Sequence, residues 1–453
     1  MKEHALARLE RAITGAIDEI GELRISGKIS EVTPAYIRVL GLSPFIKLGE
    51  CVCFMADGKL KLAEAVRIEE EGVTIKTFET ASFAQLGDRV YRARALTIFP
   101  DQLWKGRVVN ALGAPIDAGG PLARGGRAAA LEALAPPAMR RARVKKPLKT
   151  GIRAIDVFTP LCAGQRIGIF AGSGVGKSTL LAMLASALDF DSIVIGLVGE
   201  RGREVREFLD DALAVNRSRA VAVVATGDES PAMRRLAPKT AMSIAEFFRD
   251  QGESVLLIID SITRFAHAAR EIALAAGEPA VARGYAPSVF SDLPQLLERA
   301  GPGEEGKGTI TGIFSVLVDG DDHNDPVADS IRGTLDGHIV LDREIADQGR
   351  FPAINVLRSI SRLAHAAWTR EQQNAVTKLR GLIARYEDTR DLRLMGGYRP
   401  GADADLDSAV TLVPKIYEAL TQDPHSPLSK DAFRELASFL QPNEHTAKSS
   451  LQA

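Results

Sequence analysis

The feature that most constrains this chain is a glycine-rich segment that joins a β-branched run to an apolar run. It reads Ile167-Gly-Ile-Phe-Ala-Gly-Ser-Gly-Val-Gly-Lys-Ser-Thr179 and continues directly into a leucine-rich stretch. A strand, a tight glycine turn and a helix in this order form the context of a phosphate-binding loop. Glycines let backbone N–H groups turn toward phosphate oxygens, and the helix N-terminus adds a favourable partial charge. The segment therefore predicts an α/β domain that binds a nucleoside triphosphate.

Eight residues of this segment are the predicted nucleotide contacts: Gly172, Ser173, Gly174, Val175, Gly176, Lys177, Ser178 and Thr179. Lys177 has the reach for the outer phosphates, and the Ser178 hydroxyl is placed to bind Mg²⁺. The strict motif opens with glycine, whereas this chain has Ala171 at that position. Alanine adopts the backbone conformations that do not require a positive φ, so the loop accommodates this variant.

Two carboxylates follow apolar runs further along the chain. The run Val255–Ile259 ends in Asp260, and the run Ser192–Gly199 ends in Glu200. An aspartate at a strand end orients the magnesium shell in phosphate-loop sites, so Asp260 is a predicted metal residue. Hydrolysis also needs a group that orients and deprotonates water, and ligand sites of open α/β sheets lie at the carboxyl ends of strands. Glu200 is therefore a candidate catalytic carboxylate, although the arginines beside it are also compatible with a surface ion pair.

Length and charge narrow the classes of function. A chain of 453 residues predicts roughly two to four domains. A formal net charge of −1 gives no electrostatic reason to expect nucleic acid as a partner, and three cysteines are too few for a disulfide framework. The first 22 residues lack the apolar centre of a signal peptide, and no apolar run approaches the ~20 residues of a membrane span. We expect a cytoplasmic protein that is at most peripheral to a membrane.

The hydrophobic pattern divides the first third of the chain into three segments. Residues 1–22 predict an amphipathic helix, whose apolar face either docks on a partner or membrane surface or packs on its own domain. Residues 23–95 alternate in short runs separated by glycines, which predicts a small antiparallel β-barrel. Residues 96–150 contain many glycines, alanines and prolines and are predicted to form a connector.

The remaining two thirds predict a parallel sheet followed by helices. In residues 151–363 strand-like runs alternate with helical patterns, and the near-continuous apolar runs are typical of a sheet buried on both faces. The predicted strands are Ile167–Phe170, Ser192–Val198, Ala220–Ala225, Val255–Ile259, Thr309–Val318 and Ile339–Leu341. From residue 364 to residue 453 helical patterns dominate, which predicts a separate C-terminal helical domain.

Further motifs resemble those of the rotary ATP synthase and translocation ATPase family. They are Gly151-Ile-Arg-Ala-Ile-Asp156, Gly199-Glu-Arg-Gly-Arg-Glu-Val205 and Asp260-Ser-Ile-Thr-Arg-Phe265. Others are similar to the ATPases of type III export systems: Gly277-Glu-Pro, Arg283-Gly-Tyr-Ala-Pro-Ser-Val-Phe290, Gly320-Asp-Asp-His-Asn-Asp-Pro-Val-Ala-Asp329, Ile339-Val-Leu-Asp-Arg343 and Phe351-Pro-Ala-Ile-Asn-Val-Leu-Arg-Ser-Ile-Ser-Arg362. The resemblance covers the chain from about residue 24 to residue 420. It implies a RecA-like phosphate-loop core with an N-terminal β-barrel and a C-terminal helical domain. It also implies ATP and Mg²⁺ as cofactors of an ATP hydrolase that energises protein export.

The resemblance implies residue roles that spacing does not show. Glu200 matches the catalytic carboxylate, which is glutamine in non-catalytic subunits, and Arg201 matches a neighbouring arginine on the phosphate side. Arg362 matches an arginine finger supplied in trans, which implies a homohexameric ring with sites between protomers. Two departures are visible. Ala286 stands where a second proline is expected, and residues 363–370 lack a tyrosine, so no adenine-stacking residue is assigned there.

The resemblance also implies partners. The N-terminal helix is similar to a segment that binds a regulatory stator protein or lipid of the inner membrane, and the C-terminal domain to the part that meets export substrates and their chaperones. The motifs fit the flagellar export ATPases best, with the injectisome ATPases as the alternative. A ring-shaped RNA translocase shares Asp-Ser-Ile-Thr-Arg, but the barrel is poor in aromatic residues. Glu200 together with Arg362 argues against a non-catalytic subunit, and the export-type motifs argue against ATP synthesis.

Overall fold

The computed structural model describes residues 25–79, 84–187, 189–212, 214–318 and 325–441. The predicted amphipathic helix at 1–22 and the end of the chain at 442–453 lie outside these residues, as does part of the Gly320–Asp329 motif. The chain divides into two compact units. One runs to Leu96 and includes Ile272–Glu278, and the other comprises Thr97–Glu271 and the chain from Pro279 onward.

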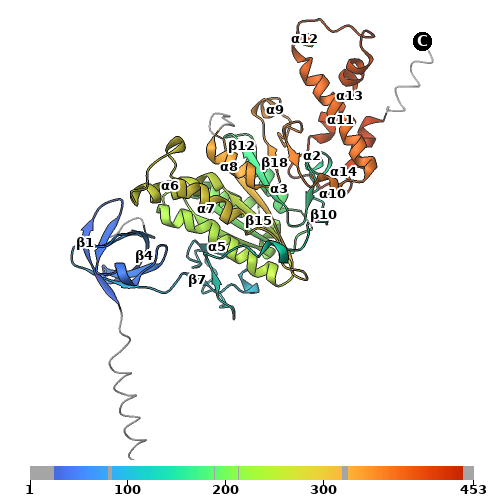
Figure 1. Cartoon of the computed structure of the whole chain (residues 1–453). Coiled ribbons are helices and arrows are strands. Elements are labelled where there is room, and N and C mark those ends of the chain that lie inside the picture. Colours follow the sequence, from blue (N-terminus) through green and yellow to red (C-terminus); the bar gives the residue numbers. More distant parts are fainter. Residues whose placement is uncertain (1–24, 80–83, 188, 213, 319–324, 442–453) are drawn as a thin grey trace, which may run out of the picture. The chain divides into compact units, whose positions relative to one another are not determined.

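The first unit contains a closed antiparallel barrel, drawn in blue in Figure 1. Its strands are β1 (Ser26–Val32), β2 (Ile37–Leu40), β3 (Cys51–Ala56), β4 (Lys59–Ile68), β5 (Val73–Thr77) and β6 (Arg89–Arg92), in the order β1-β2-β5-β4-β3-β6. Alternate side chains of a strand point to the same face, and Val39, Val52, Phe54, Ile75 and Val90 are fully buried in the interior. Closure leaves no unpaired strand edge. The predicted barrel is confirmed.

The second unit is built on a nine-stranded sheet. The strands are β8 (Val108–Asn110), β12 (Arg166–Ala171), β13 (Ser192–Val198), β14 (Ala220–Ala225), β15 (Ser254–Asp260), β16 (Gly301–Pro302), β17 (Thr309–Leu317), β18 (Gly337–Val340) and β19 (Ile360–Ser361). Their order is β19-β18-β12-β17-β15-β13-β14-β8, with β16 beside β17. Only β16 and β19 join antiparallel to their neighbours. All six predicted strands are present, and β8 places part of the predicted connector in the sheet.

Helices bury the faces of this sheet, which explains the uninterrupted apolar runs. Every residue of β13 and β14 is buried, and α5 (Pro231–Asp250) packs against β13, β14 and β15. The other helices of this part are α2 (Arg153–Phe158), α3 (Lys177–Ala185), α4 (Gly202–Glu207), α6 (Ile262–Ala275), α7 (Pro287–Leu297), α8 (Pro326–Thr334) and α9 (Arg343–Asp347). The α/β core predicted from the sequence is confirmed.

The C-terminal part is helical, as predicted, and is joined to the core through α2. Its helices are α10 (Ala364–Ala367), α11 (Arg370–Asp388), α12 (Arg390–Leu394), α13 (Ala404–Leu420) and α14 (Ala432–Leu440), drawn in orange to red in Figure 1. Helix α13 packs against α11 and α14. Arg153 of α2 donates hydrogen bonds to the carbonyls of Ala419 (2.6 Å) and Thr421 (2.7 Å) at the end of α13. Within the described chain, no helix has both the length and the apolarity to cross a membrane.

Candidate active site

The carboxyl ends of three parallel strands carry the predicted site. Strand β12 leads into the glycine-rich loop, β13 is followed by Glu200, and β15 ends in Asp260. Gly174 and Gly176 adopt positive φ angles of 77° and 87°, a backbone region that glycine enters at little cost. The loop therefore needs glycine at these positions, and it delivers Lys177 as the first residue of α3. The strand–loop–helix arrangement predicted from the sequence is present.

A lysine and two carboxylates meet beside the loop. The Lys177 ammonium forms an ion pair with Asp260, and its Nζ lies 3.9 Å from Oε1 of Glu200. The side chains of Lys177, Glu200 and Asp260 are 12%, 15% and 5% exposed. Ser315 fixes the aspartate from β17, because its Oγ donates a 2.8 Å hydrogen bond to Oδ1 of Asp260. Three groups predicted separately from the sequence thus lie together.

Glu200 carries a perturbed proton affinity. Burial raises the pKa of this carboxyl most, the nearby carboxylate of Asp260 raises it further, and Lys177 lowers it; the result is a pKa of about 7. Oε1 of Glu200 is buried and accepts no hydrogen bond from the described residues. One ammonium group cannot neutralise two carboxylates, so the second carboxylate binds a proton near neutral pH. Such a group can take up and release a proton under ordinary conditions.

A cavity of about 620 Å³ opens next to this cluster. It lies among α3, α4, the end of β15 and the segment that follows α13. Its polar lining includes Ser178, Thr179, Glu200, Glu204 and Asp260, and its apolar lining includes Met183, Leu197, Val205, Phe208 and Pro424. A volume of this size and a wall that combines apolar side chains with convergent polar groups suit a small-molecule site.

The residues at the cavity fit a magnesium ion that arrives with phosphates. Ser178 presents an exposed hydroxyl, and Asp260 a carboxylate, and Mg²⁺ prefers oxygen ligands of this kind. In the parts of the chain that the structure describes, no group of three or more histidine, cysteine, aspartate or glutamate side chains could hold a metal on its own. Mg²⁺ commonly binds through one or two protein oxygens together with substrate phosphates, so this donor set suits it.

An aromatic side chain also lies against the phosphate loop. A Cβ atom placed on Gly176 would be 3.3 Å from Cδ1 of Phe351, and the Phe351 side chain is 40% exposed. Arg343 contacts the same loop, since its Nη2 donates a 3.0 Å hydrogen bond to the Ser173 carbonyl. Sequence reasoning looked for a tyrosine after Arg362 and so missed Phe351. The signal was the phenylalanine that opens the Phe351–Arg362 motif.

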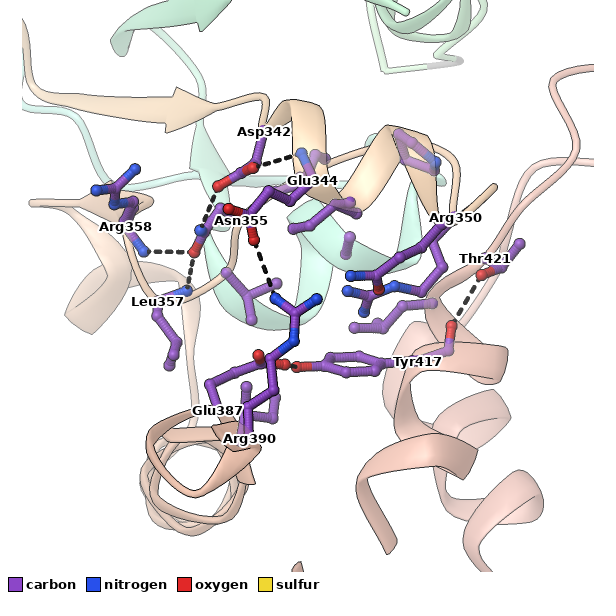
Figure 2. A pocket seen from close by; sticks show the side chains of 18 residues that line it. Asp342, Glu344, Arg350, Asn355, Leu357, Arg358, Glu387, Arg390, Tyr417 and Thr421 are labelled. Atoms are coloured by element: carbon purple, nitrogen blue, oxygen red, sulfur yellow. Dashed lines mark hydrogen bonds and ion pairs between the residues drawn. The ribbon is translucent and has the colours of Figure 1, made fainter. Parts of the chain in front are cut away.

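A second, smaller cavity of about 250 Å³ lies between residues 342–358 and the C-terminal helices (Figure 2). Glu344 pairs with Arg390 at 3.1 Å across it. The Arg350 guanidinium lies 3.8 Å from the ring centre of Tyr417, whose hydroxyl donates to Glu387. Burial and this hydrogen bond raise the pKa of Tyr417, so the phenol stays protonated. The charged side chains of this cavity pair with one another across its walls, whereas the first cavity is lined by the predicted carboxylates Glu200 and Asp260.

Comparison with known proteins identifies the family. The nucleotide-binding domain of the ATP synthase alpha/beta family matches residues 151–361, and the C-terminal domain of the type III secretion ATPase EscN matches residues 368–438. A flagellum-specific ATP synthase of Agrobacterium fabrum is 58% identical, with 91% of this chain and 88% of that protein aligned. The chain belongs to the ATP synthase alpha/beta family.

Within this family the chain is similar to ATPases of two export systems. The SPI-2 type 3 secretion system ATPase of Salmonella typhimurium is 44% identical over 87% of this chain and 90% of its own. The assembled ATPase EscN of enteropathogenic E. coli, solved in complex with its central stalk EscO, superimposes with a TM-score of 0.83. It is 38% identical and covers 92% of this chain and all of its own. These relatives make the chain an ATP-hydrolysing, homo-oligomeric member of the family.

Two residues assigned roles by resemblance to this ATPase family lie apart from the cluster. The Arg201 side chain is 87% exposed and pairs with Glu204 at 3.4 Å. Arg362 is exposed beside β19, and its guanidinium has no ion-pair or hydrogen-bond partner in the described parts of the chain. Both roles therefore stay predictions, because a single protomer does not bring either arginine to Lys177.

The raised pKa of Glu200 predicts a pH-dependent gain in stability for Glu200→Gln without nucleotide. The folded carboxyl has a pKa of about 7, against 4.5 for the ordinary group, so the folded state disfavours its ionised form. This penalty is absent below pH 4.5, grows between the two values and is complete above pH 7. The neutral amide avoids it, and the variant should gain up to about 3 kcal/mol at pH 8.5 and less than half of that at pH 5.5. Denaturant unfolding at both pH values measures the difference.

A matched control is Glu207→Gln on the neighbouring helix. The Glu207 side chain is 52% exposed and pairs with Arg203 at 2.7 Å, so its substitution should give no gain that increases with pH. A gain for Glu200→Gln that is equal at pH 5.5 and pH 8.5 would contradict the raised pKa.

Proposed function

We propose that this chain is an ATPase that energises type III protein export as a homohexameric ring with sites between protomers. We assign it to the flagellar export apparatus, with the injectisome as the alternative. The observation that carries the hydrolytic activity is the buried Glu200 carboxylate beside Lys177 and Asp260. The flagellum-specific relative at 58% identity supports the flagellar assignment over the type 3 secretion relative at 44%. Magnesium-dependent hydrolysis, the residue roles and the partners below belong to this proposal.

The loop residues bind the phosphates in this mechanism. Backbone N–H groups of Gly172–Gly176 and the N-terminus of α3 surround phosphate oxygens, and Lys177 neutralises their charge. In the nucleotide-free chain Lys177 is paired with Asp260, so a bound phosphate competes for the ammonium group. Thr179 contributes its hydroxyl as a further contact to the phosphates at the N-terminal end of α3. Ser178 and Asp260 would hold Mg²⁺, which when bound neutralises charge on the outer phosphates.

Glu200 acts as the general base. Its carboxylate lies in the cavity, accepts a proton from the attacking water and returns it after the bond is broken. A pKa of about 7 keeps a large fraction ionised at neutral pH and still makes the group a better base than an ordinary carboxylate. Lys177 holds this charge in place at 3.9 Å.

Phe351 provides a surface for the nucleotide base. Phe351 is 40% exposed, and its ring lies against Gly176 of the phosphate loop. In this proposal the base of a nucleotide whose phosphates occupy the loop stacks on this ring. An aromatic face stacks on a purine without requiring hydrogen bonds of a particular pattern. This fills the role that the sequence left without a residue.

Arg362 stabilises the transferred phosphoryl group of a neighbouring protomer. A charge at this group contributes roughly 10³–10⁵ to turnover in phosphoryl transfer. The exposed position and unengaged guanidinium of Arg362 suit a residue that completes a site in another subunit. Arg201 lies one residue after the base and would approach the phosphates of its own protomer. The assembled state of EscN supports a closed ring.

We place the protein in the cytoplasm, peripheral to the inner membrane. The segment 1–22 binds a stator or regulator protein, and the C-terminal helical domain meets export substrates and chaperones. EscN binds a central stalk, EscO, which supports a ring that works with protein partners. The near-neutral net charge of −1 and the aromatic-poor barrel give no support to a nucleic-acid partner.

Substitution of Glu200 by glutamine should abolish turnover and leave ATP binding intact. General-base catalysis contributes typically 10²–10⁴ in rate, so kcat should fall by at least about a hundredfold. Nucleotide affinity, measured by calorimetry or a fluorescent ATP analogue, should change little because the phosphate-binding groups remain. Turnover that persists in this variant would assign the base to another carboxylate.

Substitution of Arg362 by alanine should abolish hydrolysis in a way that a second inactive variant repairs. Lys177→Ala lacks its own phosphate site but still offers Arg362 to a neighbour. In rings assembled at random from equal amounts, about a quarter of the interfaces combine an intact loop with an intact finger. Each variant alone should remain inactive at the same total concentration. Absence of rescue, with mixed rings verified by native mass spectrometry, would show that Arg362 does not act in trans.

The ATPase rate per chain should rise steeply with protein concentration. Sites shared between protomers are complete only in the ring, so activity should increase as a six-subunit species forms. Steady-state rates and native mass measured on the same samples test this. A constant rate per chain from a monomer would mean that one protomer contains the whole site.

A further inference from the structure

The backbone of Arg362 is held at the edge of the sheet by few contacts. Strand β19 contains only Ile360 and Ser361 and pairs with β18 through Gly337 and His338. The Arg362 N–H donates a 2.9 Å hydrogen bond to the Asp336 carbonyl. A two-residue edge strand has little stability of its own, so its position depends on what fixes it from the core side.

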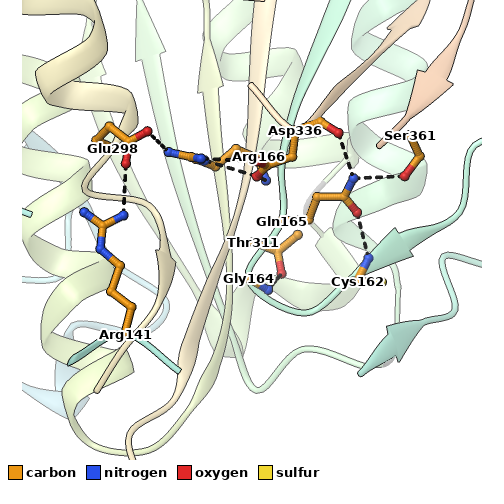
Figure 3. Close-up of polar contacts among 9 residues, drawn as sticks. All are labelled: Arg141, Cys162, Gly164, Gln165, Arg166, Glu298, Thr311, Asp336 and Ser361. Carbon is orange, nitrogen blue, oxygen red and sulfur yellow. Dashed lines mark hydrogen bonds and ion pairs between the residues drawn. The ribbon is translucent and has the colours of Figure 1, made fainter. Parts of the chain in front are cut away.

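Gln165 fixes this edge strand from the core (Figure 3). It is fully buried immediately before β12, and its Oε1 accepts a 2.9 Å hydrogen bond from the Cys162 N–H. Its Nε2 donates to the Ser361 hydroxyl at 2.9 Å and to the Asp336 carbonyl at 3.4 Å. One buried amide thus binds both the residue before Arg362 and the carbonyl that accepts its N–H.

Asp336 is itself held by Arg166, the residue that follows Gln165 in the chain. Arg166 donates from Nε and Nη2 to the two carboxylate oxygens at 3.1 and 3.2 Å, and from its backbone N–H at 3.0 Å. Arg166 also pairs with Glu298, which Arg141 contacts at 2.9 Å (Figure 3). Bidentate arginine–carboxylate pairs fix orientation as well as distance. The Asp336 carbonyl, which accepts the Arg362 N–H, therefore has a defined position.

We propose that Gln165 is a positioning residue for Arg362. It sets the backbone from which the guanidinium extends toward the neighbouring protomer, while its own side chain touches neither nucleotide nor the reacting atoms. The proposal rests on the role of Arg362 in trans. The position of the Arg362 guanidinium depends on its backbone, because in the described chain no hydrogen bond or ion pair holds the guanidinium itself. A displacement of about 1 Å in a catalytic group can cost as much as a hundredfold in rate.

The test uses Gln165→Met, which keeps the approximate shape and removes the hydrogen bonds, and Ser361→Ala, which removes only the hydroxyl. Both should lower kcat about tenfold or more and leave KM for ATP within about twofold, since the phosphate loop is unchanged. Ser361→Thr retains a hydroxyl and should keep most of the activity. Mixing either defective variant with Lys177→Ala should restore turnover, as for Arg362→Ala.

Ser243→Ala is the matched control. Ser243 is buried, donates to the Ala130 carbonyl and accepts from Arg299, both at 2.9 Å, and contacts none of the residues around Arg362. It should keep its kcat even if its thermal stability falls. If Gln165→Met does not assemble, the comparison of Ser361→Ala with Ser361→Thr decides the matter.

Three outcomes overturn the inference in different ways. Unchanged kcat in Gln165→Met and Ser361→Ala would show that the buried amide does not position Arg362. Loss of kcat that Lys177→Ala does not repair, while Arg362→Ala is repaired, would place the effect of Gln165 in its own protomer's site. Failure of repair for Arg362→Ala itself would instead reject the trans role on which the inference rests.

Discussion

The rest of the site depends on one buried arrangement of charges, in which the Lys177 ammonium lies within ion-pair distance of two carboxylates. Asp260 takes the ion pair, and Glu200 is left at 3.9 Å with one oxygen that accepts no hydrogen bond from the described residues. A buried carboxylate without full compensation is costly, and the protein responds by raising its pKa. The same cost lets Glu200 bind and release a proton near neutral pH, which is the property that the proposed general base requires. In the proposed mechanism, stability and catalysis therefore oppose each other at this position.

Strand β12 connects the phosphate loop to the edge of the sheet near Arg362. Strand β12 begins directly after Gln165, beside the edge strand that leads to Arg362, and ends at the phosphate loop. It pairs with β17 along its whole length and with β18 through Gly168, Ile169 and Phe170. A strand with neighbours on both sides resists bending, since hydrogen bonds engage its backbone on both edges. The spacing between a protomer's phosphate loop and its Arg362 is therefore set by a strand held inside the sheet.

Sequence patterns predicted those parts of the structure that local chemistry determines. The six core strands follow from apolar runs, and the phosphate loop follows from Gly174 and Gly176, which need positive φ. Asp260 and Glu200 were each predicted from an apolar run that ends in a carboxylate, and they meet because parallel strands end at one edge. Spacing could not place Phe351 beside Gly176, since that contact joins segments 175 residues apart through the tertiary fold. It also could not show that β8 enters the sheet, because the run Val108–Asn110 is too short to give a period.

The segment between β18 and β19 connects the phosphate loop to the C-terminal helices. Arg343 and Phe351 contact the loop, whereas Glu344 and Arg350 contact Arg390 and Tyr417. Arg343 and Glu344 are adjacent in α9, and Arg350 and Phe351 are adjacent after it, so each pair of neighbours has one residue in each set of contacts. A ligand can shift a structure only by the difference in its affinity for two arrangements. A nucleotide that moves the Ser173 carbonyl or the ring of Phe351 therefore acts on residues whose immediate neighbours, Glu344 and Arg350, contact α12 and α13.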